Sequence, residues 1–152
     1  MFSGARLNEI CQLQLSDIQQ EDGVWFFNLM DEGDSNKRFK SDAAIRKVPL
    51  HDELVRLGLL DFHATLMQRG EKRMFPDYTH CVKNGYGRSL GRWFNATLTP
   101  ALGIKSKHHV FHGLRHTMVS RLAQAGIEEP IYQSIVGHER QGVTQQVYNR
   151  QG

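Results

Sequence analysis

The sequence lacks several features that mark whole classes of protein. Two cysteines in 152 residues, Cys11 and Cys81, are too few for a disulfide framework and do not form a C-x-x-C pair, so reduced, buried thiols are expected. No apolar run is long enough to span a bilayer, and the N-terminus lacks the charged and apolar regions of a signal peptide. We therefore expect a cytoplasmic protein that has no membrane partner.

Two further absences limit the chemistry. The chain has no G-x-x-x-x-G-K-S/T loop to hold the phosphates of a nucleotide. It also has no cluster of carboxylates of the kind that binds a pair of catalytic metal ions. The sequence therefore shows no motif for either kind of cofactor.

Length and composition describe one ordinary globular domain. A chain of 152 residues can bury roughly two-thirds of its unfolded surface. Hydrophobic residues make up 39% and charged residues 23%, and no repeat or change of composition divides the chain, so residues 1–152 are expected to form a single domain. Nineteen Lys and Arg against sixteen Asp and Glu give a net charge of +3, which permits a polyanionic partner without requiring one.

The first part of the chain predicts a short helix followed by a small sheet. Apolar residues at near-helical spacing indicate a helix that begins near Leu7. The run VWFFNLM over 24–30 is typical of a strand, and AIRKVPL over 44–50 alternates and ends at Pro49 as a strand of a hairpin sheet does. The polar and charged segment 31–43 between them is expected to be an exposed loop or a mobile hairpin tip.

The remainder of the chain predicts helices. One helix or two short ones are expected from Asp52 to near Gly70. Another helix is expected across 89–104, with Ser89 placed to cap its start and Pro100 placed to mark a break. The fold class is therefore α+β and mainly helical.

A further helix, near the C-terminus, separates apolar from polar residues. At about 100 degrees per residue, four apolar side chains share an arc of about 80 degrees and are expected to face the core: Leu114, Met118, Leu122 and Ala125. His112, Arg115 and His116 occupy the adjoining arc. Core packing accounts for the apolar arc, but it does not account for two His and an Arg gathered beside it.

A metal centre is one interpretation of the histidine cluster. His112 and His116 are four residues apart and could share a zinc ion, with His108 and His109 nearby. Zinc sites are completed by Cys, by further His, by a carboxylate or by water, and Arg115 between the two His would repel a dication. We therefore disfavour a metal-dependent enzyme, and we expect His108 and His109 to be exposed loop residues.

The C-terminal run FHGLRHTMVSRLAQAGIEEPIYQSIVGHERQGVTQQVYNR favours a different interpretation. It contains H-x-x-R on a helix, then Gly-His with its His 23 positions after that Arg, then a Tyr ten positions later. Each element is weak alone. In this order they resemble the active-site signature of the tyrosine recombinases, the phage-integrase-like family of DNA breaking and joining enzymes. The matching residues are His112, Arg115, His138 and Tyr148.

The resemblance extends to the N-terminal half. SGARLNEICQLQLSDI is similar to the family's first active-site segment, whose Gly-x-Arg-x-x-Glu implies the first catalytic arginine at Arg6 and a supporting carboxylate at Glu9. FKSDAAIRKVPLH resembles the hairpin that carries the catalytic lysine, and Lys40 matches best. Because Lys40 lies slightly further from the end of the strand than is usual, Lys37 and Lys47 stay open, and Lys47 is the weaker because it lies within the alternating strand.

The resemblance implies a transesterification of DNA strands, similar to that of type IB topoisomerases, that requires no metal or nucleotide cofactor, and the absence of both motifs fits this. Two arginines would bind the phosphate through bidentate, permanently charged donors. Tyr148 would attack, His112 would accept its proton, and His138 would donate a hydrogen bond to a non-bridging oxygen. Lys40 would protonate the departing 5′ oxygen. The product would be a 3′-phosphotyrosyl enzyme and a free 5′ hydroxyl.

The resemblance also implies a fold and partners. The expected fold is that of a tyrosine recombinase catalytic domain with a small three-stranded antiparallel sheet, and the expected partner is double-stranded DNA, with association to the nucleoid when bound. Five residues precede Arg6 and four follow Tyr148, so the N-terminal core-binding domain is expected to be absent. We expect a monomer in isolation and a tetrameric synapse on DNA for the full-length protein of a phage or genomic island. A non-catalytic DNA-binding or regulatory fragment of an integrase is the alternative.

Overall fold

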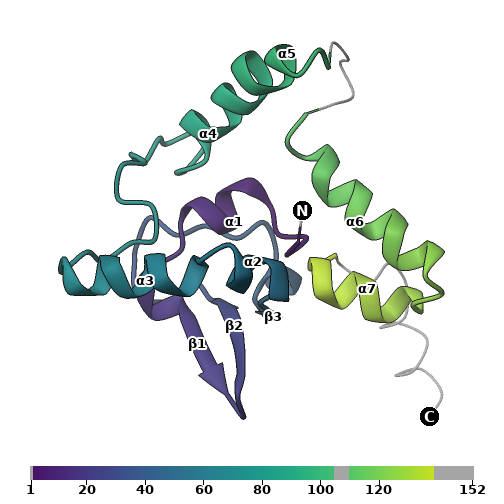
Figure 1. Cartoon of the computed structure of the whole chain (residues 1–152), viewed down its shortest axis with the longest axis horizontal. Helices are drawn as coiled ribbons and strands as arrows, with labels where there is room; N and C mark the ends of the chain where they lie inside the picture. The colour runs from purple at the N-terminus through teal and green to yellow at the C-terminus, as the bar shows by residue number, and fades with distance from the viewer. Residues whose placement is uncertain (1, 105–109, 139–152) are drawn as a thin grey trace, which may run out of the picture.

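The computed structural model describes residues 2–104 and 110–138, and it begins with a short helix that leads into an antiparallel sheet (Figure 1). The helix is α1 (Leu7–Cys11), and a 3-10 turn (Leu15–Asp17) follows it. The sheet has the order β1-β2-β3, with strands at Ile18–Glu21, Val24–Leu29 and Arg46–Pro49. The predicted helix near Leu7 and both predicted strands are confirmed.

The sheet is built around a tight hairpin and one buried face. Asp22 and Gly23 join β1 to β2 with φ angles of 50° and 80°, as a two-residue hairpin turn with positive φ requires. Ile18 pairs with Phe27, and Phe27 pairs with Val48, so three buried apolar side chains align across the strands. This face forms the centre of the main hydrophobic core.

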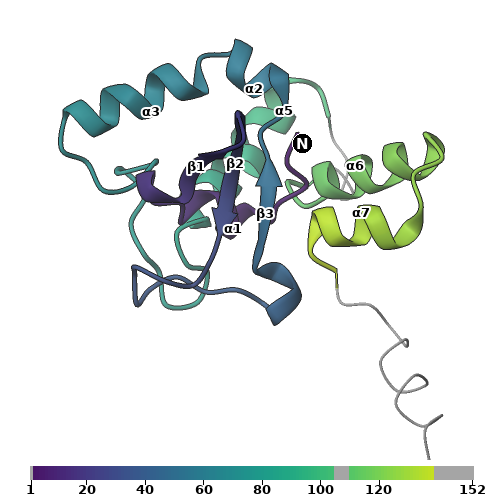
Figure 2. The same cartoon turned by 90° about the horizontal axis from the view of Figure 1, so that it is seen from below.

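Helices α2 (Asp52–Arg56) and α3 (Leu59–Gln68) run along one side of the sheet (Figure 2). Leu66 of α3 is buried in the core cluster, and Leu54, Leu59 and Leu60 pack against it. The expectation of one or two helices that stop near Gly70 is confirmed, since α3 ends at Gln68 and Gly70, two residues later, has a φ of 72°.

The segment between β2 and β3 differs from its prediction. Most of its side chains are exposed, but Lys37 is only 7% exposed and its Nζ lies 2.8 Å from a carboxylate oxygen of Asp17. The backbone of Arg38 is hydrogen-bonded on both sides by the side chain of Gln12. The prediction of an exposed or mobile tip is therefore wrong in the middle of the segment, because a buried aspartate outside it draws a lysine inward.

A helical arm follows the loops after α3 and lies beyond α1 in Figure 1. It consists of α4 (Arg88–Trp93), a π-helical segment (Phe94–Leu98) and α5 (Thr99–Ala101). The predicted cap is wrong, because the helix begins one residue before Ser89 with Gly87 at the N-cap. Pro100 lies in the first turn of α5. The change to π-helical bonding directly before it suits a residue that has no N–H to donate.

Helices α6 (Gly113–Gln124) and α7 (Glu129–Val136) form a pair beside β3 (Figure 2). The predicted apolar arc of α6 is confirmed only in part, because Leu114, Met118 and Leu122 are half-buried and Ala125 is exposed. The buried residue of this helix is Arg115. Beside β3, the contacts between this helix pair and the rest of the fold are more polar than apolar.

The two cysteines occupy different environments. Cys11 is fully buried, and desolvation raises the pKa of its thiol to about 12. Cys81 is free but only half-buried, so the expectation of buried thiols is wrong for this residue. Over residues 2–104 and 110–138, no helix is long and apolar enough to cross a membrane.

We predict that Leu29→Ala lowers the free energy of unfolding by about 2–5 kcal/mol, because truncating a buried Leu removes packed methyl groups and leaves a cavity. Leu29 is 1% exposed, whereas Leu57 is 67% exposed. Leu57→Ala is therefore the matched control, with an expected change within about 0.5 kcal/mol. Urea unfolding of both variants measures the difference, and equal effects would contradict the core described here.

Candidate active site

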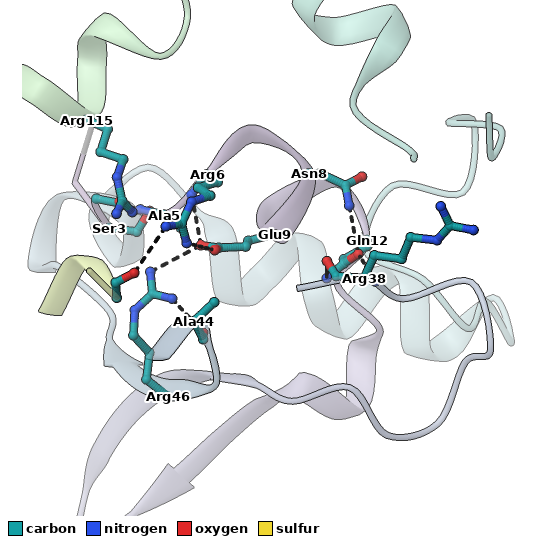
Figure 3. A network of polar contacts seen from close by, with 12 residues as sticks. Ser3, Ala5, Arg6, Asn8, Glu9, Gln12, Arg38, Ala44, Arg46 and Arg115 are labelled. Atoms are coloured by element: carbon teal, nitrogen blue, oxygen red, sulfur yellow. Dashed lines mark hydrogen bonds and ion pairs between the residues drawn. The ribbon is translucent and has the colours of Figure 1, made fainter. Parts of the chain in front are cut away.

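The first element of the site is an arginine at the start of α1. Arg6 is the N-cap residue, and its Nη1 lies 2.7 Å from Oε1 of Glu9 one turn later. The backbone N–H of Arg6 donates to Oε2 of the same carboxylate at 2.9 Å. Nη2 of Arg6 donates to the carbonyl of Gly137 at 3.1 Å, so the guanidinium spans from α1 to the end of α7 (Figure 3).

A second arginine, Arg46 of β3, completes the surroundings of Glu9. Its Nη2 lies 3.1 Å from Oε2 of Glu9, its Nε donates to the carbonyl of Ile135 at 2.8 Å, and its Nη1 donates to the carbonyl of Ala44 at 2.6 Å. Sequence reasoning missed Arg46. The available signal was its place in the alternation, because Arg46 lies on the same face of the strand as Val48 and Leu50.

The protonation of Glu9 follows from these contacts. Its carboxylate is 2% exposed, and burial alone would raise its pKa. The positive charge of Arg46 and the hydrogen bonds from Arg6 and Arg46 outweigh burial and hold the pKa below its ordinary value. Glu9 is therefore ionised at neutral pH and orients both guanidiniums.

Arg115 enters the site from α6 and is 3% exposed. Its Nη1 donates to the carbonyl of Gly4 at 2.7 Å, while its buried Nε and Nη2 have no hydrogen-bond partner among the described residues. Desolvation and the neighbouring charge of Arg6 lower the pKa of Arg115 to about 10. The group stays charged at neutral pH, and its two unpaired donor nitrogens favour an anion.

The glycines of the two motifs, Gly-x-Arg and Gly-His, lie too close to neighbouring atoms to carry a side chain. Gly4 has a φ of 60°, and a Cβ there would lie 2.7 Å from Sδ of Met118. Gly137 has a φ of 65°, and a Cβ there would lie 2.7 Å from the carbonyl oxygen of Ala43. Each glycine can therefore bring its carbonyl to the arginine of the other motif, Gly4 to Arg115 and Gly137 to Arg6.

Two histidines lie within electrostatic reach of the arginines. His112 is the N-cap residue of α6, and its ring centroid is 4.8 Å from that of His116. Desolvation lowers the pKa of His112, and the charges of His116, Arg115, Arg6 and Lys40 lower it further. Desolvation also lowers the pKa of His138, followed by the charge of Arg115. Both imidazoles are thus favoured in their neutral form.

The three candidate lysines have different surroundings. Nζ of Lys37 is buried against Asp17 and also donates to the carbonyl of Glu32 at 3.1 Å. Nζ of Lys47 lies 2.5 Å from Glu21 in an exposed ion pair. Lys40 is exposed, and it is the lysine whose charge affects the pKa of His112. These contacts favour Lys40, whose catalytic role stays a prediction.

Three residues named from the sequence, Tyr148, His108 and His109, lie outside the described residues. Helices α1 and α6 and the end of α7 bring five of the predicted site residues to one region: Arg6, Glu9, Arg115, His112 and His138. Within the part of the chain that the structure describes, no group of three His, Cys, Asp or Glu is arranged to hold a metal ion.

Two hollows formed by described residues adjoin the arginines. A cavity of about 240 Å³ between the N-terminal segment, α4 and α6 is lined by Arg6, His112 and Arg115 among others. An open groove continues from Arg6 and His112 along α4, where it is lined by Lys83, Arg88 and Arg92. No carboxylate is present among the described residues that line this groove. The arrangement suits an anion at the arginines with further negative charge alongside.

Comparisons with known proteins identify a family and a similar fold. The model of the Phage integrase family matches residues 1–152. The crystal structure of XerA recombinase is similar in fold, with a TM-score of 0.58 and 20% sequence identity over 91% of this chain and 45% of that one. The chain thus spans less than half the length of XerA recombinase. No curated protein sequence matches the chain.

We predict that Arg46→Met lowers the free energy of unfolding by about 1.5–3 kcal/mol, because a buried carboxylate loses one of its two cationic partners. Arg56→Met is the matched control, since Arg56 forms an ion pair with Glu53 and its side chain is 69% exposed. Its expected effect is within about 1 kcal/mol. Denaturant unfolding measures both, and a loss no larger than in the control would contradict a structural role for Arg46.

The same variant should lose less stability in acid than the wild type. Because its pKa is lowered, Glu9 contributes stability that is present above its unfolded pKa and is lost as the pH falls through the folded pKa. Removing the charge of Arg46 raises the folded pKa toward the unfolded one, so the free energy of unfolding should fall less between neutral and acidic pH in Arg46→Met than in the wild type. Denaturant unfolding at several pH values measures this, and an equal fall in both proteins would contradict the pairing of Glu9 with Arg46.

Proposed function

Because the chain belongs to the phage integrase family, we propose that it is the catalytic domain of a site-specific DNA recombinase or integrase that cleaves and rejoins DNA strands through Tyr148. The observation that carries the proposal is the pair of guanidiniums of Arg6 and Arg115 beside one cavity, with two buried donor nitrogens of Arg115 unpaired among the described residues. Such donors require an acceptor, and the surrounding charge favours an anionic one.

A phosphodiester fits this environment. Arg6, Arg46 and Arg115 bring three positive charges together, and Glu9 offsets one of them. A phosphodiester has two non-bridging oxygens that share one negative charge, and the transition state of phosphoryl transfer carries more charge on them. Arginine binds such oxygens through paired N–H donors. Arg6 and Arg115 are therefore proposed as the phosphate clamp, with Glu9 as its support.

The proposed reaction balances without a cofactor. The phenolic oxygen of Tyr148 bonds to phosphorus, the bond from phosphorus to the 5′ oxygen breaks, and a 3′-phosphotyrosyl bond forms. His112 accepts the phenol proton, and Lys40 gives a proton to the 5′ oxygen. His138 donates a hydrogen bond to a non-bridging oxygen. A 5′ hydroxyl that attacks the phosphotyrosyl bond then reseals the strand or joins it to another.

The neutral imidazoles support these roles. A proton acceptor must be unprotonated when the phenol attacks, and the lowered pKa of His112 favours that state at neutral pH. A neutral imidazole can still donate through its N–H, so His138 can serve as a donor with its own lowered pKa. The exposed Lys40 is available to close on bound DNA, whereas Lys37 and Lys47 are paired with carboxylates.

Double-stranded DNA is the proposed partner. The groove beside the site, with Lys83, Arg88 and Arg92 and no carboxylate among its described lining, would follow the phosphates on one side of the reacting bond. We further propose that the isolated chain is monomeric, that the full-length protein forms a tetrameric synapse on DNA, and that it associates with the nucleoid when DNA-bound.

A second candidate function is a DNA-binding or regulatory fragment that does not cleave. The basic groove favours it, because phosphate binding there does not depend on Tyr148. The two functions differ in whether a covalent bond to DNA forms.

We predict that the 152-residue chain forms a covalent adduct with a nicked suicide substrate, from which the short 5′ strand diffuses away after cleavage. The adduct should resist EDTA, because no proposed step uses a metal. Tyr148→Phe should abolish it while leaving DNA retention unchanged, since only the nucleophilic oxygen is removed. Denaturing gel electrophoresis of labelled DNA measures the adduct.

The alternatives give different results in the same assay. Retention of DNA that weakens with salt, without any adduct in the wild type, would favour the non-cleaving fragment. Loss of the adduct on chelation would favour a metal-dependent enzyme. An adduct that persists in Tyr148→Phe would sink the assignment of the nucleophile.

We predict that cleavage at subsaturating DNA rises with pH along an acid limb whose midpoint lies below 6.5, the ordinary pKa of His. Desolvation and the charge of His116 lower the pKa of His112, so its accepting form persists at lower pH. His116→Gln removes that second cause and should move the midpoint to higher pH. Single-turnover rates across pH measure this, and an unchanged midpoint in the variant would contradict His112 as the acceptor.

A further inference from the structure

The loop that carries Lys40 is anchored just before this residue by a buried glutamine. Gln12 is 1% exposed, and its Oε1 accepts from the backbone N–H of Arg38 at 3.0 Å while its Nε2 donates to the carbonyl of Arg38 at 3.2 Å (Figure 3). Two bonds to one backbone unit fix both its place and its orientation, as pairing does in a sheet. A third bond, from Asn8 to Oε1 at 2.9 Å, holds the glutamine itself.

A buried ion pair anchors the residue before Arg38. The side chain of Lys37 is 1% exposed, and its Nζ lies 2.8 Å from Asp17. Asp17 is held in turn, because it accepts from the backbone N–H of Gln14 at 2.7 Å. A lysine bound in this way does not reach a substrate. Its ion pair instead fixes the position of the loop.

The other end of the loop is anchored to the arginine network. Ala44 is fully buried, and its carbonyl accepts from Arg46, which Glu9 holds. Lys40 therefore stands in a short span, 39–43, between two fixed points; Lys40 itself is exposed, while Phe39 before it packs against the core. The lysine can move its side chain, but its Cα is confined.

One helix sets both parts of the site in register. Arg6 is the N-cap of α1, Glu9 lies in its first turn, and Gln12 is its C-cap. With a rise of 1.5 Å per residue, the two caps are about 9 Å apart along the axis. The phosphate clamp thus begins at one end of α1, and the anchor of the lysine loop lies at the other.

We infer that Gln12 and the Lys37–Asp17 pair are positioning residues for Lys40, and that they hold its ammonium within reach of the departing 5′ oxygen. The inference rests on the proposed function and on the assignment of Lys40. An unanchored loop would spread Lys40 over many positions, and misplacement of a reacting group by about 1 Å can cost about 100-fold in rate. Removing an anchor should therefore slow the step that needs the lysine proton and leave phosphate binding in place.

A DNA substrate with sulfur in place of the bridging 5′ oxygen separates proton delivery from other roles. A thiol has a pKa of about 8.5, far below that of an alcohol, so a thiolate leaves without being protonated. A variant that fails only in proton delivery should cleave normal DNA slowly and the sulfur substrate at the wild-type rate. A variant with a damaged fold or phosphate clamp should lose both rates equally.

We predict that Gln12→Met, which keeps the length of the side chain and removes its bonds to Arg38, cleaves normal DNA about 10- to 100-fold more slowly than the wild type. On the sulfur substrate it should be within about threefold of the wild type, as Lys40→Ala should be. The neutral double variant Asp17→Asn with Lys37→Met should behave in the same way. Single-turnover adduct formation measures all rates.

Gln14→Met is the matched control. Gln14 also bonds the same loop through its Nε2, to the carbonyl of Gly33 at 3.2 Å, but this contact is exposed and lies at the far end from Lys40. Its rates on both substrates should equal those of the wild type. A loss on normal DNA as large as that of Gln12→Met would show that any loosening of the loop slows cleavage and would overturn the specific role of Gln12.

The outcomes distinguish this inference from its premises. If the wild type cleaves neither substrate, the proposed function is wrong and the inference is wrong with it. If Lys40→Ala cleaves normal DNA at the wild-type rate, the assignment of Lys40 is wrong, and so is a role for its anchors. If the sulfur substrate restores Lys40→Ala but a variant of an anchor stays equally slow on both substrates, that anchor serves the fold alone.

Discussion

The buried carboxylate of Glu9 is the interaction on which the rest of the site depends. It joins the start of α1 to β3 through Arg6 and Arg46, and the same two guanidiniums reach the carbonyls of Gly137 and Ile135 at the end of α7. Three segments far apart in the sequence therefore meet around one charge. Because an unpaired buried charge is very costly, Glu9 tolerates little displacement of either arginine.

The carbonyl of each motif glycine also accepts a hydrogen bond from the arginine of the other motif. Gly4 accepts from Arg115, and Gly137 accepts from Arg6, so each arginine is oriented by the segment that carries the other motif. Both glycines have positive φ and closely approach neighbouring atoms that a side chain would strike. With three arginines, Arg6, Arg46 and Arg115, around the single carboxylate of Glu9, the site has a surplus of positive charge. That surplus is what makes the site receptive to an anion.

Much of this arrangement could be predicted from the sequence, because its signals are local. The helix near Leu7 and the strands over 24–30 and 44–50 follow from spacing and alternation within a few residues. The order and spacing of the motif residues indicated the family, whose model matches residues 1–152. Ser89 shows the limit of local signals, because its suitability as a cap did not decide where α4 begins.

By itself the sequence determined which reactive groups the chain carries, since an arginine brings its charge and a histidine or a tyrosine its proton-accepting or nucleophilic atom wherever it lies. Only the tertiary structure decided how these groups are partnered. Arg46 meets a carbonyl 89 positions away, and Lys37 is paired with a buried aspartate 20 positions before it. Burial and pairing depend on contacts between distant segments, and no periodicity in the chain records them.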